Sequence, residues 1–318
     1  MKLNTLIIAA IAAVGLTATS CQKYDDQKPT IAGIAVANAD FSTLEAAAIK
    51  GGVAVVLSNS NPGDPSGHYT VFAPNNAAFA RLGLVDEGSL AALNTTFLTN
   101  TLLYHVSNGD LIGSALTNNS KSGSALGGLT RRIVLRGSDK YINGSKILAT
   151  DISASNGTVH VIDKVMIASG ANIVNTAIAA STANVFASPE LTFLVAAVVK
   201  SGLAATLSDP TANFTIYAPT DAAFKAAGFP TAAAVSALPA ATLQAVLLNH
   251  AVGGGKFTSE LNSTTAATAG GGTLTYGAFN NGTYTIKSNG IASPANMVIP
   301  DIQCTNGIVH IIDKVLLP

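Results

Sequence analysis

Four of the five histidines in this chain stand at repeated positions, and histidine is the side chain most readily used for metal binding or proton transfer. His105 and His160 recur as His250 and His310, whereas His68 has no counterpart. A zinc site needs three or four ligands, usually with a closely spaced pair. The two histidines of each copy are 55 or 60 residues apart, and no cysteine or carboxylate is obviously placed to complete a set. We therefore predict no metal site and a structural role, in which each imidazole is hydrogen-bonded between strand and helix. Contact with a ligand is the alternative.

The sequence shows no familiar catalytic motif either. It lacks the Gly-x-Ser-x-Gly nucleophile turn, the His-Glu-x-x-His metal motif and the Gly-x-x-x-x-Gly-Lys phosphate loop. Acidic residues are few, and no pair of carboxylates stands out as a hydrolytic site. We expect no catalytic residues and no cofactor. A hydrolase acting on an extracellular polymer stays open as an alternative.

The histidines belong to a long internal repeat. Residues 70–79 return as 215–224, and residues 156–165 return as 306–315, at offsets of 145 and 150 residues. A solenoid unit runs only roughly 20–50 residues, whereas a whole domain has about 100–150. The chain is therefore predicted to hold two copies of one domain, at residues 30–170 and 171–318.

Each copy places its repeated motifs on a short strand, a helix and a final strand. In the segment Thr-x-aromatic-Ala-Pro, the proline ends the strand because it cannot donate a hydrogen bond to the ladder. Asn75 and Thr220 then suit the N-cap of a helix that begins with Ala-Ala-Phe. Asn-Gly pairs at 156–157 and 306–307 predict hairpin turns before the last strand. Helices come first and strands later, which favours an α+β fold over a parallel βαβ sheet.

Together these motifs resemble the fasciclin, or FAS1, domain. The resemblance rests on Thr-x-aromatic-Ala-Pro-(Asn/Thr)-(Asn/Asp)-x-Ala-Phe, a mid-domain Tyr-His and a terminal Asn-Gly-x-Val-His-x-Ile-Asp, and it covers roughly residues 30–318. It implies two tandem domains, each a β-sheet wedge with helices packed on one side, in a non-enzymatic protein of cell-surface adhesion. The motif residues expected to be structural are Pro74, Phe79, His160, Asp163, Pro219, Phe224, His250, His310 and Asp313.

Within this family, the Tyr-His pair and its aliphatic neighbours are associated with receptor binding. By resemblance, the binding residues are Leu102, Leu103, Tyr104, His105 and Val106. The second copy departs from the pattern, with Asn249 in place of the tyrosine. A helix end packed against the sheet is the alternative explanation of this segment. An inserted loop at residues 59–68, rich in Asn, Pro, Gly and Ser, is predicted to lie on the surface.

The N-terminus is predicted to be the export signal of a lipoprotein. Residues 3–18 form a mainly apolar run of 16 residues, shorter than the roughly 18 that span a membrane. The small residues before Cys21 resemble the lipobox of bacterial lipoproteins, although Ala18 stands where that pattern prefers leucine. We predict a signal peptide at residues 1–20, lipidation of Cys21 and a flexible tether at 21–29. An ordinary signal peptide with an incidental cysteine, or a disulfide between Cys21 and Cys304, is the alternative.

The tether also bears on location. Its Gln-Lys-acidic composition resembles the export signal of surface lipoproteins in the Bacteroidetes group. We predict a lipid-anchored protein of the bacterial outer membrane that faces outward.

Charge restricts the possible partners. Seventeen basic residues balance 17 acidic ones, and charged residues make up 11% of the chain. Nucleic acid is therefore not expected as a partner, because phosphate contacts need clustered Lys and Arg. The one basic cluster, within residues 131–146, is interpreted as a solvated strand face.

Two classes of binding function fit these observations best. The first is an adhesion or interaction lipoprotein that binds a protein or glycan at the cell surface. The second is a carrier that holds a small molecule or lipid in an apolar pocket between the sheet and the Ala-rich helices. Cys304 aligns with Ala154 and is expected to be an inert core thiol. The sequence gives no indication of the oligomeric state.

Overall fold

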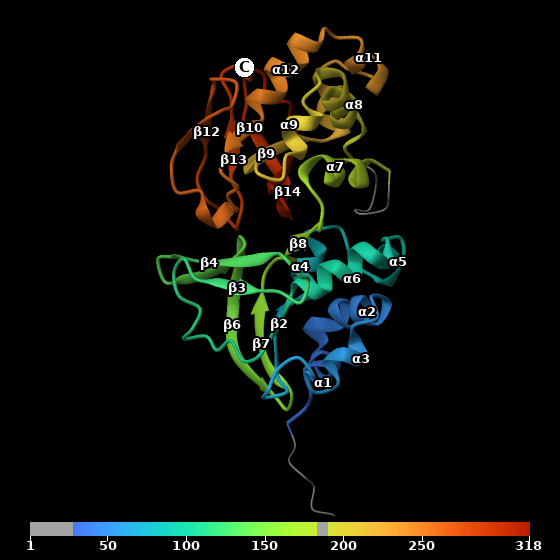
Figure 1. The fold of residues 1–318 in the computed structure, drawn as a ribbon, viewed down its shortest axis with the longest axis vertical. Coiled ribbons are helices and arrows are strands. Elements are labelled where there is room, and N and C mark those ends of the chain that lie inside the picture. Colours follow the sequence, from blue (N-terminus) through green and yellow to red (C-terminus); the bar gives the residue numbers. More distant parts are fainter. Residues whose placement is uncertain (1–27, 183–189) are drawn as a thin grey trace, which may run out of the picture.

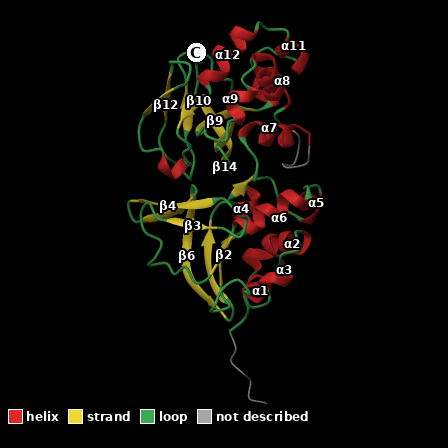
Figure 2. Cartoon of the chain, viewed as in Figure 1, coloured by secondary structure: helices red, strands yellow, loops and turns green. Residues whose placement is uncertain are grey.

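The computed structural model describes residues 28–182 and 190–318, in two repeated units that stack end to end along the longest axis of the molecule (Figure 1). Domain 1 (residues 30–166) and domain 2 (residues 169–318) each set strands beside helices, and the α-helices of both lie on the same side of the molecule (Figure 2). The predicted signal peptide, Cys21 and most of the tether lie outside the described residues. Among the described helices, none has the length and apolar character needed to cross a membrane.

Domain 1 begins with helices and ends with strands. Its helices are α1 (Ile31–Ala37), the 3-10 helix η1 (Ala39–Phe41), α2 (Ser42–Lys50), α3 (Ala54–Leu57), α4 (Asn76–Ala80), α5 (Glu87–Ala91) and α6 (Thr95–Tyr104). Its strands are β1 (Tyr69–Pro74), β2 (Val106–Asn108), β3 (Lys121–Gly123), β4 (Thr130–Arg136), β5 (Asp139–Ile142), β6 (Ser145–Ala154) and β7 (Gly157–Ile162).

Domain 2 repeats this order. Its helices are α7 (Ile173–Thr182), α8 (Thr192–Ser201), α9 (Ala204–Ser208), α10 (Asp221–Ala226), α11 (Ala232–Ser236), α12 (Ala240–Asn249) and the 3-10 helix η2 (Thr258–Glu260). Its strands are β9 (Phe214–Pro219), β10 (Ala251–Gly253), β11 (Thr265–Ala267), β12 (Thr273–Tyr276), β13 (Thr285–Lys287), β14 (Ala295–Cys304) and β15 (Gly307–Ile312).

The two sheets have the same topology. The strand order is β2-β1-β7-β6-β5-β4-β3 in domain 1 and β10-β9-β15-β14-β13-β12-β11 in domain 2. In each sheet the first long strand pairs in parallel with the last, β1 with β7 and β9 with β15. The other neighbours on these two paths are antiparallel. This arrangement confirms the predicted α+β fold of two tandem wedges with helices on one side.

A short strand, β8 (Ile167–Ala168), joins the two domains. It pairs in parallel with β14, so it belongs to the sheet of domain 2 although the repeat predicted that domain 1 extends to residue 170. The side chains of β8 point into different hydrophobic cores. Ile167 packs in the helix-side core of domain 2, whereas Ala168, like Met166 just before the strand, packs in the wedge core of domain 1. One strand therefore contributes to both hydrophobic cores.

The predicted helix caps are present. Asn75 Oδ1 accepts the backbone N–H of Ala78 at 2.9 Å. Thr220 Oγ1 accepts the N–H of Ala223 at 3.0 Å. These bonds satisfy N–H groups that the first turn of a helix leaves unpaired. The motif residues beside them, Pro74, Phe79, Pro219 and Phe224, are all buried.

The asparagine of each Asn-Gly turn ties the last hairpin to the helices. Asn156 Oδ1 accepts the N–H of Ile31 at 2.9 Å. Its Nδ2 donates to the carbonyls of Leu57 at 2.9 Å and Asn59 at 2.8 Å. Asn306 makes the same three bonds in domain 2, to Ile173, Leu207 and Asp209. The turn motif thus fixes helices that precede it by about a hundred residues, which no local pattern indicates.

The glycine of the same turn is needed for close packing. Gly157 has φ of 147°, and a Cβ at this position would lie 1.9 Å from the carbonyl oxygen of Tyr69 on β1. Gly307 stands in the same relation to Phe214 O, at 2.2 Å. Only glycine allows the parallel strands to approach at this point.

Candidate functional site

A buried histidine stabilises a bulge in the sheet of domain 1. The register of β6 shifts between Ile147 and Ile152, and Asp151 has φ of 64°. A bulge removes backbone groups from the regular ladder. His160 Nδ1 accepts the N–H of Asp151 at 3.2 Å, and its Nε2 lies 2.7 Å from the carbonyl of Leu111. The imidazole is therefore neutral, with the proton on Nε2.

Domain 2 repeats this arrangement. Asp301 on β14 has φ of 67°, its N–H donates to His310 Nδ1 at 3.0 Å, and His310 Nε2 lies 3.0 Å from the carbonyl of Lys256. Each ring also contacts an aromatic residue of the neighbouring strand. The centroid distance is 5.1 Å from His160 to Phe72 and 5.5 Å from His310 to Tyr217.

The other two histidines close the ends of helices. His105 Nδ1 donates to Thr101 O at 2.7 Å, and its Nε2 accepts the N–H of Met166 at 2.9 Å. His250 makes the corresponding bonds to Val246 O at 2.8 Å and Leu316 N at 2.8 Å. Burial lowers the pKa of His105 and of His250 to about 4, and it also lowers the pKa of His160 and of His310.

These contacts give all four imidazoles a structural role. Both ring nitrogens of each are used by the backbone, so none is free to bind a metal ion or to move a proton to a substrate. The predicted bridge between strand and helix is not what these rings make. His105 and His250 join a helix to a loop, and His160 and His310 join a strand to a loop. In the described ranges 28–182 and 190–318, no three His, Cys, Asp or Glu side chains come close enough together to hold a metal ion.

The terminal aspartates of the motif also bond to backbone. Asp163 Oδ1 accepts the N–H of Lys146 at 2.7 Å, and Asp313 Oδ1 accepts the N–H of Asn296 at 2.7 Å. Each therefore fixes the beginning of the neighbouring long strand. Cys304 is free and buried, and burial raises the pKa of its thiol to about 11, as expected for an inert core cysteine.

The predicted binding segment lies mostly inside the molecule. Leu102, His105 and Val106 are buried, Tyr104 is fully buried, and only Leu103 is partly exposed. The hydroxyl of Tyr104 donates to Oε1 of Gln303 in domain 2 and also contacts Asn143 Nδ2. Receptor binding by this segment stays a prediction. In this structure its tyrosine faces the second domain of the same chain.

A buried ion pair joins the domains beside this tyrosine. Lys164 Nζ of domain 1 lies 2.7 Å from Asp301 Oδ2 of domain 2 and donates to Gly282 O at 2.8 Å. The side chains are 8% and 6% exposed. Asp301 Oδ1 also accepts the N–H of Thr258 at 2.6 Å. This charge pair is therefore desolvated and supported by further hydrogen bonds, which is the arrangement that a buried pair requires.

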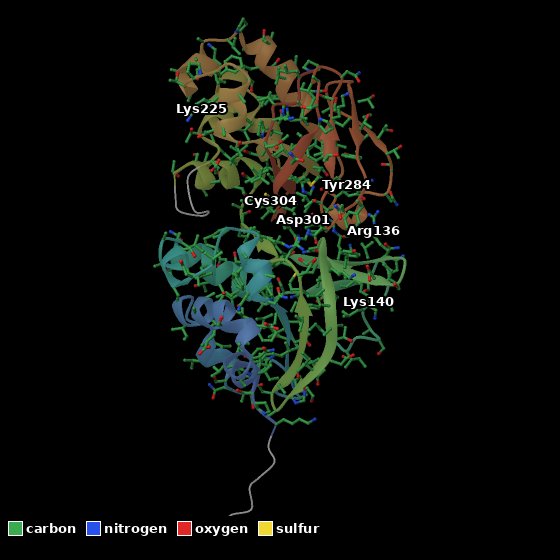
Figure 3. All side chains as sticks on the ribbon, turned by 180° about the vertical axis from the view of Figure 1, so that it is seen from behind. Arg136, Lys140, Lys225, Tyr284, Asp301 and Cys304 are labelled. Atoms are coloured by element: carbon green, nitrogen blue, oxygen red, sulfur yellow. The ribbon has the colours of Figure 1, made fainter. Side chains whose placement is uncertain are left out.

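Two arginines of the basic cluster extend this interface. Arg132 Nη1 is 3.0 Å from Glu260 Oε1, and its guanidinium lies over the ring of Phe257 at 4.5 Å. Arg136 donates to Leu261 O at 3.0 Å and lies over Phe279 at 4.1 Å. Figure 3 places Arg136, Tyr284 and Asp301 at the junction of the domains.

The third arginine of the cluster is internal. Arg131 is fully buried in domain 1, where it donates to Tyr104 O at 2.9 Å and Ser122 Oγ at 2.8 Å. Burial lowers its pKa to about 10. The interpretation of the cluster as a solvated strand face is therefore wrong for its arginines. The sequence shows the basic residues but not the second domain that covers two of them.

Comparison with known proteins agrees with this architecture. The model of the Fasciclin domain matches residues 39–168 and again residues 189–318. The chain belongs to the fasciclin family. Transforming growth factor-beta-induced protein ig-h3 of Oryctolagus cuniculus is 31% identical over 271 residues, which are 79% of this chain and 35% of ig-h3. Protein sll1483 of Synechocystis sp. is 32% identical over 169 residues, 52% of this chain and 89% of that protein.

Other fasciclin proteins are matched over different extents. Immunogenic protein MPB70 of Mycobacterium bovis is 32% identical over 103 residues, which are 32% of the length of this chain and 50% of the length of MPB70. The match to a solved FAS1 domain pair from the insect cell adhesion molecule Fasciclin I covers 79% of this chain and 89% of the Fasciclin I chain, with 20% identity and a TM-score of 0.40. The chain thus spans about a third of ig-h3 but most of sll1483. Fasciclin domains occur in cell-adhesion and extracellular proteins.

The buried imidazoles of this fasciclin pair predict acid sensitivity. The folded pKa of His105 and His250 lies below the unfolded value of 6.5, so the unfolded chain takes up protons first as the pH falls. Each buried, neutral imidazole therefore makes its full contribution to the free energy of unfolding above pH 6.5. This contribution, roughly 3 kcal/mol for each histidine, is lost as the pH falls toward 4. Urea unfolding between about pH 7.5 and about pH 4 measures this. His105→Gln should show a smaller pH dependence of the free energy of unfolding than the unmodified chain. An equal pH dependence in the two chains would contradict this prediction.

The interdomain ion pair predicts an asymmetry between equivalent lysines. Lys164→Met leaves the Asp301 carboxylate buried without its counter-ion, which should lower the free energy of unfolding by about 3–5 kcal/mol. Lys314→Met changes the matching lysine of domain 2, which lies at the surface and contacts Ser293 and Pro294. Its effect should stay within about 0.5 kcal/mol. Equal losses in the two variants would show that the interface does not depend on this pair.

Proposed function

We propose that this fasciclin protein is a non-enzymatic interaction protein of the cell surface, which binds a protein or glycan and presents its two domains as one rigid body. The observation that carries the proposal is the interdomain contact of Lys164, Arg132 and Arg136, which fixes the surfaces of both domains relative to each other. A binder that is ordered before it meets its ligand pays less conformational entropy on association. Membership of a family found in adhesion and extracellular proteins supports the same function.

The loop at residues 60–68 is the contact surface that we assign to domain 1. It exposes Pro62, Pro65 and Ser66, and domain 2 has no counterpart of the same length. Buried Asn61 holds the loop from inside, with Nδ2 donating to His68 O at 2.8 Å. His68 Nδ1 also lies 2.5 Å from Asp110 Oδ2. The loop is thus exposed at its tip and fixed at its base, as a specific contact surface requires.

Replacing the loop tests this assignment. Exchange of residues 60–68 for residues 210–213 of domain 2 should lower binding of the fluorescently labelled chain to cells by about tenfold or more, since loss of a hot-spot residue costs about 2 kcal/mol or more. The melting temperature should change little because Asn59, whose carbonyl Asn156 binds, is kept. The reverse exchange in domain 2 is the control and should leave binding unchanged. Full binding after the first exchange would refute the loop as a contact.

Anchorage by lipid at Cys21, in the outer membrane and facing outward, completes the proposed function. The small residues before Cys21 and the polar tether after it support this part. Several acyl chains, each stabilised by about 0.8 kcal/mol per buried methylene, hold a protein on a bilayer.

The two cysteines provide a matched test of anchorage. Cys21→Ser should abolish incorporation of labelled palmitate and move the protein from the membrane fraction to the soluble fraction. Cys304→Ser, which changes the buried thiol, should leave both measurements as in the unmodified chain. Protease treatment of intact cells then reports whether the anchored protein faces outward. Unchanged membrane association of Cys21→Ser would exclude this anchor.

A further inference from the structure

Domain 1 contains an apolar cavity that domain 2 nearly lacks. The cavity lies between α1, α2, α3 and β1 and has a volume of about 240 Å³. The corresponding space in domain 2, beside α7, α8 and β9, has about 50 Å³. A cavity of about 150 Å³ lined by aliphatic residues is already large enough to bind benzene. The two domains share a fold but differ in what this space can hold.

Side-chain size explains the difference. Ala48 on α2 lines the cavity of domain 1, whereas Val198 occupies the matching position in domain 2. Ala32 on α1 likewise corresponds to Val174. The extra methyl groups fill in domain 2 the space that the alanines leave in domain 1. Empty apolar space destabilises a protein, because the lining atoms lose their packing partners. The space in domain 1 therefore carries a cost in stability that a bound occupant would offset.

The cavity reaches the surface through an apolar rim. Val36 on α1 and Ile49 on α2 both line it and are 64% and 65% exposed. Val55 on the adjacent α3 is 73% exposed. Aliphatic side chains are thus exposed where the cavity opens, which suits the entry of an apolar chain.

One charged side chain lines this apolar space. Glu45 on α2 is partly buried, and the described residues offer it no hydrogen bond or ion pair. Its counterpart in domain 2 is Val195. The other polar lining groups are already used: Ser58 Oγ donates to Ala54 O at 2.9 Å, and His105 bonds to the backbone through both nitrogens. Glu45 is therefore the lining group that can still recognise a ligand. A carboxylate attracts amines and hydroxyls and repels carboxylates and phosphates.

We propose that the cavity of domain 1 binds a single-chain amphiphile whose head group donates a hydrogen bond, an alkyl amine or alcohol, with the chain among Ala32, Ala48 and Leu44 and the head group at Glu45. The volume favours one chain, because it lies below the roughly 300–1,000 Å³ of pockets for drug-sized ligands. The charge excludes fatty acids and phospholipids as preferred ligands. This activity goes beyond adhesion and belongs to domain 1 alone.

Displacement of the uncharged dye Nile red from the full chain tests the proposal. The Cys21→Ser chain is used so that no covalently attached acyl chain can enter the cavity. Decylamine and decanol should displace the dye, and decylamine should bind about tenfold or more tightly than decanoate, since discrimination of this size needs only one unfavourable charge contact. Glu45→Gln should remove most of the preference for the amine over decanoate while keeping decanol binding.

Two further variants test the position of the ligand. Ala48→Val, which copies domain 2, should weaken decylamine binding by about tenfold or more while the chain stays folded, because a tightly packed site has no room for the ligand. Val198→Ala, the reverse change in domain 2, is the matched control and should leave the affinity of the domain 1 site unchanged. Circular dichroism checks that both variants are folded.

Three outcomes would overturn the proposal. Decanoate could bind as tightly as decylamine, or Ala48→Val could bind decylamine as well as the parent chain. Binding by the Cys21→Ser chain but not by the unmodified, membrane-derived protein would instead assign the cavity to the protein's own acyl chain.

Discussion

Each domain depends on one hydrogen bond between a bulged strand and a buried imidazole. The N–H of Asp151, or of Asp301, leaves the regular ladder, and the histidine of the final strand receives it. Without this acceptor, a buried amide would remain unpaired, at a cost of about 1–3 kcal/mol. A bulge also bends the strand that carries it, here β6 in domain 1 and β14 in domain 2. In domain 2 it also sets Asp301 where Lys164 of domain 1 can reach it.

The structure explains one of the sequence differences between the two domains by their contact with each other. Tyr104 contacts the other domain, whereas its counterpart Asn249 donates to Leu316 O at 2.9 Å within domain 2. Lys164 and Lys314 are the same residue type, yet Lys164 enters the interface whereas Lys314 bonds to Ser293 and Pro294 within domain 2. Sequence divergence in a duplicated chain therefore reflects, in part, the contact of the copies with each other. The cavity lined by Ala48 and the loop at residues 60–68 are the differences that this contact does not explain.

The sequence predicts the local features well because their causes are local. Capping by Asn75, the turn at residues 156–157 and the burial of Phe79 all follow from a few neighbouring residues. The interface between the domains does not follow from neighbouring residues, because Arg132 and Lys164 look like ordinary surface cations until domain 2 is placed over them. The sequence offers an apolar pocket beside the Ala-rich helices as one possibility, but it does not indicate that the space differs between the two domains. Ala48 reads as a good helix former, and its small size matters only when the facing helices are known.

The strand β8 has a mechanical consequence. Ile167 is embedded in one hydrophobic core, while its neighbours Met166 and Ala168 are embedded in the other. A force that pulls domain 1 away from domain 2 cannot stretch this connection without withdrawing side chains from both hydrophobic cores. Such a force would thus be shared by two folded units, and the junction between them would resist extension instead of yielding first.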